Sequence, residues 1–305
     1  MVNKVKDSGL GEKFIKTGGR VINNKGLFNV VKIGGERRNL YQQLISFSWP
    51  RFLVLALLFY LSVNIIYAQV YYLIGPYCIE GIPPGTQFSR FLYCFFFSIQ
   101  TFTTVGYGNL HPVGMAANIV ATIEALTGLM GFALITGLLY GRFSRPSPKI
   151  RFSDEMVMHK EDDNYEMHFQ MVNPRQTLII EPKVKVLLKL ADKENGTRSF
   201  YELKLRISGI LFFALNWRVV HEIDESSPLF GMTEEEVKNQ NMEILILLSG
   251  FEESFHQHIY VKHSYDHSQI KWNHHFIPAY DTNENGMTVM DIEKVHVNEP
   301  DIEQG

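Results

Sequence analysis

The sequence has 305 residues, of which 46% are hydrophobic, and its 29 basic and 32 acidic residues give a formal net charge of −3. This length accommodates two domains, and the near balance of charge predicts no nucleic-acid partner. The two cysteines, Cys78 and Cys94, are too few for a disulfide framework, so most of the chain is expected to face a reducing compartment.

The apolar residues are concentrated in two long runs. Residues 52–74 carry no charge, and as a helix they would measure roughly 35 Å, enough to cross a bilayer core of about 30 Å. Residues 112–141 contain one charged residue, Glu124. We therefore predict membrane-spanning helices over 50–74 and 112–143. A buried helix in a soluble core is the alternative, and a signal peptide does not fit because the first run begins so far along the chain.

The basic residues flank these runs unevenly. Ten lie in residues 1–51, four more follow the second run, and residues 75–111 between the runs hold only Arg90. By the positive-inside rule, both termini are expected in the cytoplasm and the connecting segment outside, in a two-span protein of the cell membrane.

The first 49 residues are predicted to form two cytoplasmic segments before the first span. Residues 1–38 are basic and glycine-rich with weak periodicity, which predicts a flexible segment. Residues 39–49 place Leu40, Leu44 and Ile45 near one face, which predicts an interfacial helix on the inner leaflet. Alternatively these residues form the first turn of the span, although Pro50 favours a break.

Between the spans lies an apolar segment, residues 89–102, that is too short to cross a membrane. Irregular backbone at membrane depth occurs only where protein buries it or where it lines a water-filled cavity. A re-entrant pore helix with a return loop over residues 89–109 is therefore predicted.

The return loop contains the sequence TTVGYG, residues 103–108. A dehydrated K⁺ ion needs oxygen ligands, and successive carbonyl groups can supply them if glycines allow positive φ at alternate positions. The predicted K⁺ filter consists of Thr103, Thr104, Val105, Gly106, Tyr107 and Gly108. In it, the side chains of Val105 and Tyr107 pack outward, and Thr104 adds its hydroxyl group as a ligand at the inner mouth. An ordinary Gly-Tyr-Gly turn in an outer loop is the alternative. One chain supplies one wall, so a closed ring requires several chains.

From Pro146 onward the sequence predicts a different kind of domain. Short alternating segments are separated by polar turns, which is typical of an all-β sandwich over residues 146–305. One helix is expected over Thr233–Gln240, with Thr233 as its N-cap.

The chain resembles the prokaryotic inward-rectifier potassium channel (KirBac) family over roughly residues 39–280. The matching stretches, besides the filter, are SFSWP (46–50), EALTGLMGFA (124–133), YGRFSRP (140–146), VVHEIDESSPLFG (219–231), LLSGFEE (247–253) and IKWNHHF (270–276). The resemblance implies a homotetramer and an α+β membrane protein: two transmembrane helices, a re-entrant pore helix and filter, and an immunoglobulin-like cytoplasmic β-sandwich that extends the pore.

The resemblance also implies roles along the second span. Gly128 matches the family's hinge glycine, and Leu138 with Tyr140 marks the gate, where Tyr140 could instead be an interfacial anchor. Glu124 is a carboxylate in an apolar span, which is expensive unless it is paired. We expect it to support the filter rather than to bind ions; its protonation stays open.

In the β domain, Glu181 and Glu253 match acidic residues of the family's cytoplasmic pore, where fourfold repetition could hold Mg²⁺ or polyamines weakly. Without the resemblance they would read as solvated strand residues. Basic residues near the membrane are predicted to bind anionic phospholipids. The alternative is that they only set the orientation of the protein in the membrane. These residues are Arg37, Arg38, Arg142, Arg145, Lys149 and Arg151.

The sequence departs from eukaryotic members of the family at several positions. Phe132 stands where strong rectifiers carry an acid or amide, and Gln100 with Leu110 replaces a glutamate–arginine pair that braces the filter. No cysteine follows the filter, which puts the family's outer disulfide in doubt. Seven histidines lie in the range His221–His275, where a metal site or a pH sensor is the alternative to an ordinary structural role. They offer no recognisable ligand set, so the only metal predicted is K⁺ at the filter.

The sequence thus predicts a homotetrameric, K⁺-selective channel of inward-rectifier type with no cofactor and no enzymatic activity. A calcium- or nucleotide-gated channel would require a βαβ domain with a glycine-rich fingerprint, which is not found. The alternative from another class is a membrane-anchored β-sandwich sensor with a non-conducting pore.

Overall fold

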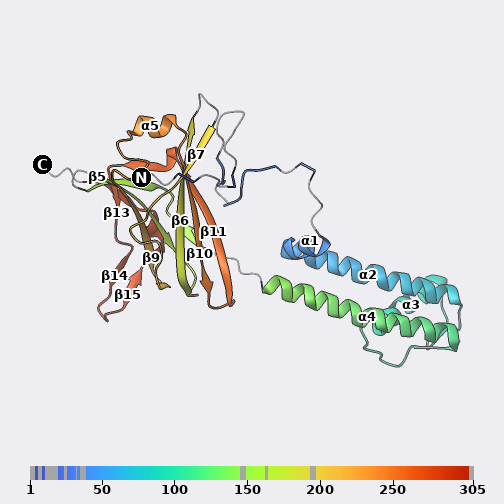
Figure 1. Ribbon diagram of the computed structural model, residues 1–305. Helices are drawn as coiled ribbons and strands as arrows, with labels where there is room; N and C mark the ends of the chain where they lie inside the picture. Colours follow the sequence, from blue (N-terminus) through green and yellow to red (C-terminus); the bar gives the residue numbers. More distant parts are fainter. Residues whose placement is uncertain are drawn as a thin grey trace. The chain divides into compact units, whose positions relative to one another are not determined.

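The computed structural model of this chain describes residues 4–5, 9–10, 20–23, 26–31, 33–34, 39–144, 149–161, 164–192 and 197–301. The chain divides into two compact units (Figure 1). A helical unit lies within Gly34–Arg145, and a β-rich unit lies within Pro146–Gly305, to which the described residues of Met1–Ile33 also belong.

The described residues of the helical unit form four helices: α1 (Leu40–Ser46), α2 (Trp49–Ile74), α3 (Gln87–Phe102) and α4 (Gly114–Phe143). Phe47 and Ser48, which separate α1 from α2, are extended, with ψ of 153° and 154°. Pro50 lies in the first turn of α2, where its missing N–H removes no helical hydrogen bond. The break between α1 and α2 therefore lies at Phe47 and Ser48, just before Pro50, which the sequence had indicated as the position of a break.

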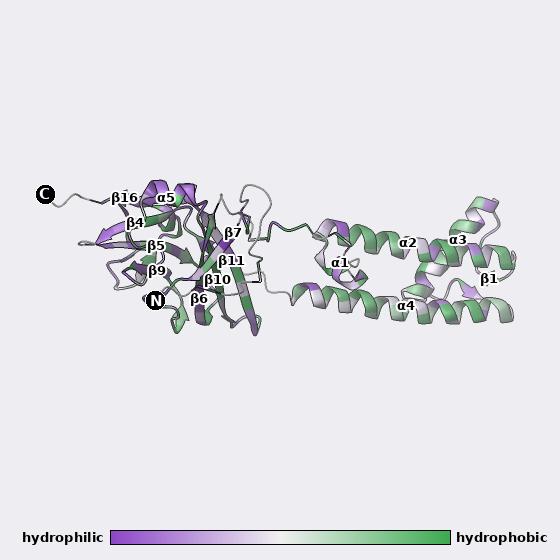
Figure 2. Cartoon of the chain, turned by 45° about the horizontal axis from the view of Figure 1, so that its top comes forward, coloured by the Kyte–Doolittle hydropathy of each residue, from purple (hydrophilic) through white to green (hydrophobic). Residues whose placement is uncertain are grey.

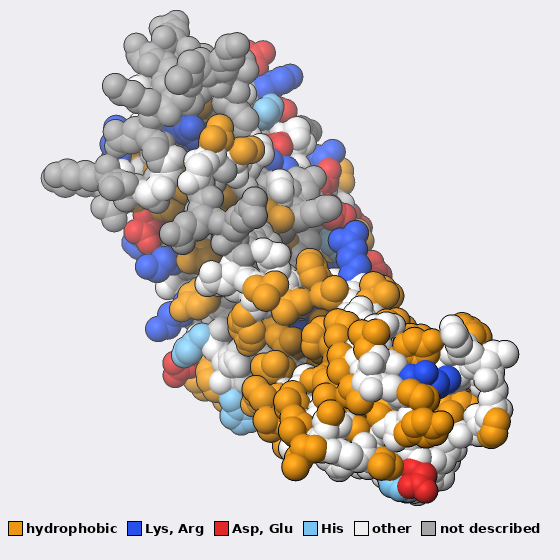
Figure 3. Space-filling model, turned by 90° about the vertical axis from the view of Figure 1, so that its right-hand side faces the viewer, with side chains coloured by type: hydrophobic (Ala, Val, Ile, Leu, Met, Phe, Trp, Pro, Cys, Tyr) orange, Lys and Arg blue, Asp and Glu red, His pale blue; other side chains and the backbone are white. Residues whose placement is uncertain are grey.

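The two long helices are predominantly hydrophobic along their length (Figure 2). Only 11% of the apolar window of α2 and 22% of that of α4 is buried, so neither helix forms the core of a soluble domain. Hydrophobic side chains also gather over the end of this unit that carries α3 (Figure 3). Such a surface is stable only when lipid or other protein covers it.

The short helix α3 packs between the long helices. Thr86 caps its N-terminus by accepting a hydrogen bond from the Ser89 N–H at 3.1 Å. Its buried face is Cys94, Phe97, Ser98 and Phe102. A short antiparallel ribbon closes the segment that contains α3 and its return loop. In this ribbon, β1 (Ile79–Glu80), which precedes α3, pairs with β2 (His111–Pro112), which follows the loop.

The β-rich unit is a sandwich of two five-stranded sheets. The first sheet has the order β11-β10-β6-β7, with β8 paired to β6, and the second has the order β12-β4-β5-β3, with β9 paired to β5. The strands of the first sheet are β6 (Ile179–Asp192), β7 (Thr197–Glu202), β8 (Phe212–Phe213), β10 (Glu243–Glu252) and β11 (Gln257–Asp266). Those of the second are β3 (Arg151–Phe152), β4 (Met156–Glu161), β5 (Asn164–Val172), β9 (Asn216–Ile223) and β12 (Ile270–Trp272).

Shorter elements complete this unit. Strand β13 (His274–Phe276) pairs with β16 (Asn298–Pro300), and β14 (Tyr280–Thr282) pairs with β15 (Thr288–Met290). Helix α5 (Glu234–Asn239) begins with a capping box between Thr233 and Glu236, which confirms the predicted N-cap. Two 3₁₀ turns, η1 (His267–Gln269) and η2 (Ile292–His296), connect strands.

The core of the sandwich lies between the sheets. One buried cluster combines Met156 and Phe169 from the second sheet with Leu188 and Ile246 from the first. Because side chains alternate along a strand, each sheet turns one apolar face toward the other. The predicted β-sandwich is confirmed.

The N-terminal residues described in the structure differ from the flexible segment that the sequence predicts. Val21 and Ile22 are buried, with exposures of 7% and 3%. Their backbone N–H groups donate to the carboxylate of Glu243 at 2.8–3.1 Å, and the Lys189 ammonium lies 2.9 Å from the same carboxylate. This buried carboxylate anchors the segment because two backbone donors and one cation satisfy it.

Candidate functional site

The return loop after α3 has an alternating backbone. Thr104, Gly106 and Gly108 have positive φ, at 56°, 53° and 85°. The N–H groups of Val105 and Gly106 both donate to the Gln100 carbonyl, at 2.9 and 3.2 Å, which ties the loop to the end of α3. Such alternation lets successive carbonyl groups face the same side. Sequence reasoning expected positive φ at the two glycines and missed it at Thr104.

The filter side chains are not covered within the single chain. Val105 and Tyr107 are 53% and 77% exposed. The side-chain Oε1 of Gln100 is buried with no hydrogen-bond partner among the described residues. The described residues of the single chain therefore leave two side chains of the loop exposed and one buried polar atom beside it without a hydrogen bond.

Glu124 of α4 lies in a buried network that joins three helices. Its Oε2 accepts a 2.6 Å hydrogen bond from the Tyr71 hydroxyl of α2, and its Oε1 lies within hydrogen-bond distance of the Ser98 hydroxyl of α3. The Ser98 hydroxyl also lies 3.0 Å from Oδ1 of Asn64. All four side chains are fully buried. Hydroxyl donors on both sides offset the cost of placing a carboxyl group in an apolar span.

Sequence reasoning identified Glu124 but not its partners. Tyr71, Ser98 and Asn64 are each a polar residue within an apolar run, and that pattern was the available signal. The Tyr71 ring also packs edge-on against Phe97 at 5.0 Å, which holds its hydroxyl toward α4.

Gly128 lies where α4 meets the C-terminal end of α3. A Cβ atom at this position would be 1.9 Å from the Phe102 carbonyl oxygen. Glycine is therefore required for close packing, while α4 runs through Gly128 as one continuous helix. The hinge role expected for this residue stays a prediction.

The predicted gate residues lie near the C-terminal end of α4. Leu138 is half-buried and Tyr140 is 73% exposed. Phe132, one of the departures from the eukaryotic pattern, is 72% exposed on the same helix.

Arg142, predicted to bind lipid, makes contacts within the helical unit. Its guanidinium donates to the carbonyl oxygens of Leu44 and Phe47, each at 2.8 Å, and stacks on Trp49 and Phe52 at 4.7 and 4.6 Å from the ring centroids. Carbonyl groups at a helix C-terminus lack intrahelical partners, and a cation there is favourable. Arg142 thus fastens α1 and the start of α2 to α4.

The other predicted lipid-binding residues have different surroundings. Lys149 is exposed, and Arg151 pairs with Glu293 at 2.7 Å on the surface of the β-rich unit. Three of them lie outside the described residues: Arg37, Arg38 and Arg145.

Glu181 and Glu253 lie at one end of the first sheet. Glu181 has a positive φ of 46° and sits in a β-bulge of β6 opposite Gly250, while the Glu253 N–H donates to the Leu178 carbonyl at 3.2 Å. Glu181 therefore lies in β6 and Glu253 directly follows the neighbouring strand β10, and both residues are solvent-exposed in the single chain.

Two apolar spans around a re-entrant helix and glycine loop, followed by a β-sandwich, define a two-span ion channel. Residues 57–145 match the family described as "Ion channel", and residues 150–301 match "Inward rectifier potassium channel C-terminal domain".

Curated relatives agree with these matches. The chain is 35% identical over 284 residues to "Inward rectifier potassium channel Kirbac3.1" of Paramagnetospirillum magnetotacticum. This match covers 91% of this chain and 95% of the relative. It is 25% identical over 233 residues to mouse "G protein-activated inward rectifier potassium channel 4" and 29% identical over 203 residues to human "Inward rectifier potassium channel 4". These matches cover 71% and 62% of this chain, but only 54% and 45% of the mouse and human proteins.

The chain belongs to the inward rectifier potassium channel family. The matched families and these relatives are ion channels and not enzymes. This agrees with the transmembrane channel class and the fold that the sequence predicts.

Proposed function

We propose that four copies of this chain form a K⁺-selective channel of inward-rectifier type, with Thr103–Gly108 of each copy lining a central filter. The observation that carries the proposal is the alternating positive φ at Thr104, Gly106 and Gly108. Carbonyl groups turned to one side can replace the hydration shell of K⁺, the permeant ion. Glu124 and its hydroxyl partners act as filter support, because they hold α3 between α2 and α4.

The uncovered groups around the filter support assembly with copies of the same chain. A neighbouring subunit would pack against exposed Val105 and Tyr107, and against Oε1 of Gln100, which has no hydrogen-bond partner in the described part of the chain. In a closed ring each subunit presents the same surface to the next, so cyclic symmetry covers these groups in every subunit.

The gate is proposed at the cytoplasmic end of α4, with both termini in the cytoplasm as the basic flanks indicate. Four copies of Leu138 and Tyr140 would narrow the pore sterically and by dewetting. Movement about Gly128 would open it.

Regulation is proposed at two further places. Rings of Glu181 and Glu253 would concentrate cations and hold Mg²⁺ or polyamines weakly, giving mild rectification. Anionic phospholipids would bind basic residues next to the membrane, each contributing about 1 kcal/mol. Lys149 is the exposed member of the described set, whereas Arg142 and Arg151 already have partners within the chain.

The test is ⁸⁶Rb⁺ uptake into liposomes that contain the purified protein, with Ba²⁺ block, Na⁺ competition and a Gly106→Asp control. We expect uptake that Ba²⁺ blocks, that Na⁺ does not compete with, and that the control abolishes. Repeating the assay with increasing anionic phospholipid tests lipid regulation, and Glu181→Gln with Glu253→Gln should reduce spermine block.

Oligomeric state is measured on the same preparation by light scattering in detergent. A tetramer with no uptake in any lipid mixture would contradict the conducting channel and favour the β-sandwich sensor with a closed pore. A monomer would contradict the shared filter itself.

A further inference from the structure

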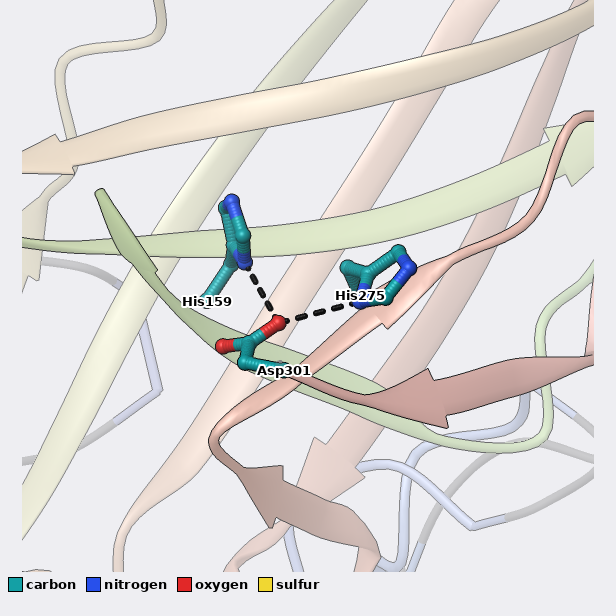
Figure 4. A group of neighbouring side chains, drawn as sticks. All are labelled: His159, His275 and Asp301. Carbon is teal, nitrogen blue, oxygen red and sulfur yellow. Dashed lines mark hydrogen bonds and ion pairs between the residues drawn. The ribbon is translucent and has the colours of Figure 1, made fainter. Parts of the chain in front are cut away.

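A cluster of metal-ligand side chains lies in the β-rich unit, apart from the filter. His159 belongs to β4, His275 to β13, and Asp301 follows β16. The Nδ1 atoms of the two histidines both point at Oδ1 of Asp301, at distances of 2.8 and 3.1 Å (Figure 4). The ligand atoms of the three residues all lie within 4.8 Å of one another.

Backbone hydrogen bonds hold these three side chains in place. The Asn273 N–H donates to the Met158 carbonyl and the Asp301 N–H donates to the Asn273 carbonyl, both at 2.8 Å. On the other side of His159, the Lys160 N–H donates to Oδ2 of Asp301 at 3.1 Å. The strands therefore fix the cluster through the main chain on both sides of His159, and binding an ion would require little reorganisation.

The spacing of the donor atoms matches a small transition-metal ion. Metal–ligand bonds of about 2.0–2.1 Å in a tetrahedral site place neighbouring donor atoms roughly 3.3 Å apart. The two nitrogen–oxygen distances, 2.8 and 3.1 Å, would widen by only a few tenths of an ångström to admit the ion. Two imidazoles and one carboxylate suit Zn²⁺, Co²⁺ or Ni²⁺, whereas Ca²⁺ and Mg²⁺ prefer all-oxygen sites.

Solvent can reach the cluster. The side chain of Asp301 is 14% exposed and that of His159 is 28% exposed, so the site is shielded from bulk water but can be reached from it.

The neighbouring hollow, of about 280 Å³, offers room for a further ligand such as water. His159, His168 and His275 line it together with acids and two arginines. Nδ1 of His168 is buried there without a hydrogen-bond partner among the described residues, while its Nε2 lies 2.8 Å from Glu166. The arginines carry positive charge, but Arg206 pairs with Glu166 and Glu222, and Arg218 donates to the Phe276 carbonyl at 2.8 Å.

From this arrangement we infer that His159, His275 and Asp301 bind one divalent transition-metal ion of the Zn²⁺ class per chain. The ion fastens the segment after β16 to β4 and β13, and water completes its coordination on the side of the hollow. The site shares no residue with the proposed filter or gate, because all three ligands lie in the β-rich unit.

The test uses the full-length protein in detergent, with its affinity tag removed and its metal stripped by chelation. Co²⁺ serves as the spectroscopic probe because tetrahedral Co²⁺ absorbs visible light, and Zn²⁺ is titrated by calorimetry. We expect saturable binding of one ion per chain and a melting temperature that rises with metal concentration. His159→Gln and Asp301→Asn should each weaken binding at least tenfold, whereas His256→Gln and His267→Gln should not change it.

No saturable binding to the wild-type protein would overturn the inference, as would unchanged affinity in the His159 and Asp301 variants. X-ray absorption of the Co²⁺-loaded wild type provides a measurement that needs no variant. Two imidazole nitrogens in the first coordination sphere support the site, and one or none refutes it.

Discussion

Replacing Gly128 by alanine tests the contact between the pore helix and α4. The new Cβ would lie 1.9 Å from the Phe102 carbonyl oxygen and 2.8 Å from its carbonyl carbon, although Cβ contacts under 3.0 Å essentially never occur. Both atoms belong to the backbone, so no side-chain rotation relieves the overlap. The helices must separate by about 1 Å, as overpacked interiors do.

The expected cost follows from two opposing effects. Overpacking costs about 1–3 kcal/mol, and a backbone clash of this size belongs at the upper end. Alanine gains about 1 kcal/mol over glycine in a helix, so the net destabilisation is about 1–2 kcal/mol. Because Thr103 directly follows Phe102, the shift also displaces the filter, and K⁺ flux should be lost before the protein unfolds.

The assay compares ⁸⁶Rb⁺ uptake and melting temperature across three variants. Gly131→Ala places its Cβ at an ordinary 3.4 Å from the Phe102 ring, and Gly137→Ala meets no atom within 4 Å. These controls should keep wild-type uptake and match or exceed wild-type stability. If Gly128→Ala also kept wild-type uptake and stability, the packing argument would be refuted.

Three further perturbations probe other contacts. Lys189→Met leaves the buried Glu243 carboxylate without its cation and should cost about 3–5 kcal/mol, measured by thermal unfolding; the exposed Lys185→Met is the control, and equal losses would contradict the prediction. Burial, with Arg20 nearby, lowers the pKa of His263 to about 4, so the unfolded chain binds more protons below about pH 6.5. The free energy of unfolding should therefore fall by up to about 3 kcal/mol as pH drops from 6.5 to 4, and His263→Phe should flatten that slope. Arg142→Gln removes the charged donor to α1 and should weaken the docking of α1 on α4 by about 1–3 kcal/mol, which would be seen as faster proteolysis near Ser46. Equal proteolysis rates in Arg142→Gln and an Arg51→Gln control would contradict the role of Arg142 in holding α1.

Local patterns in the sequence predicted much of the architecture. A charge-free run long enough to span a bilayer predicts a helix whatever surrounds it, and α2 and α4 begin within two residues of the predicted positions. Alternating strands and turn residues likewise predicted the sandwich, because one buried face imposes a period of two. The positive φ of Gly106 and Gly108 was predicted because glycine at alternate positions of a filter has a specific backbone consequence.

Contacts between distant segments were not predictable in the same way. The anchoring of Val21 to Glu243 joins residues 222 positions apart, and no local pattern marks Glu243 as different from an ordinary strand acid. His159 and Asp301 are separated by 142 positions and meet only because β13, β16 and β4 converge. Arg142 was predicted to bind lipid, because its pairing with the Leu44 carbonyl of α1 depends on how two helices pack and leaves no local pattern in the sequence.

The ribbon of β1 and β2 should make the segment between these two strands tolerant of changes in chain length. Because Ile79 pairs with Pro112 and Glu80 with His111, the ends of the pore-helix segment are already held together. The entropy of a closed loop grows slowly, so even doubling its length costs only about 0.6 kcal/mol. A peptide tag inserted between Pro83 and Pro84, both in the turn before α3, should therefore leave the filter intact and provide a label on that face of the membrane.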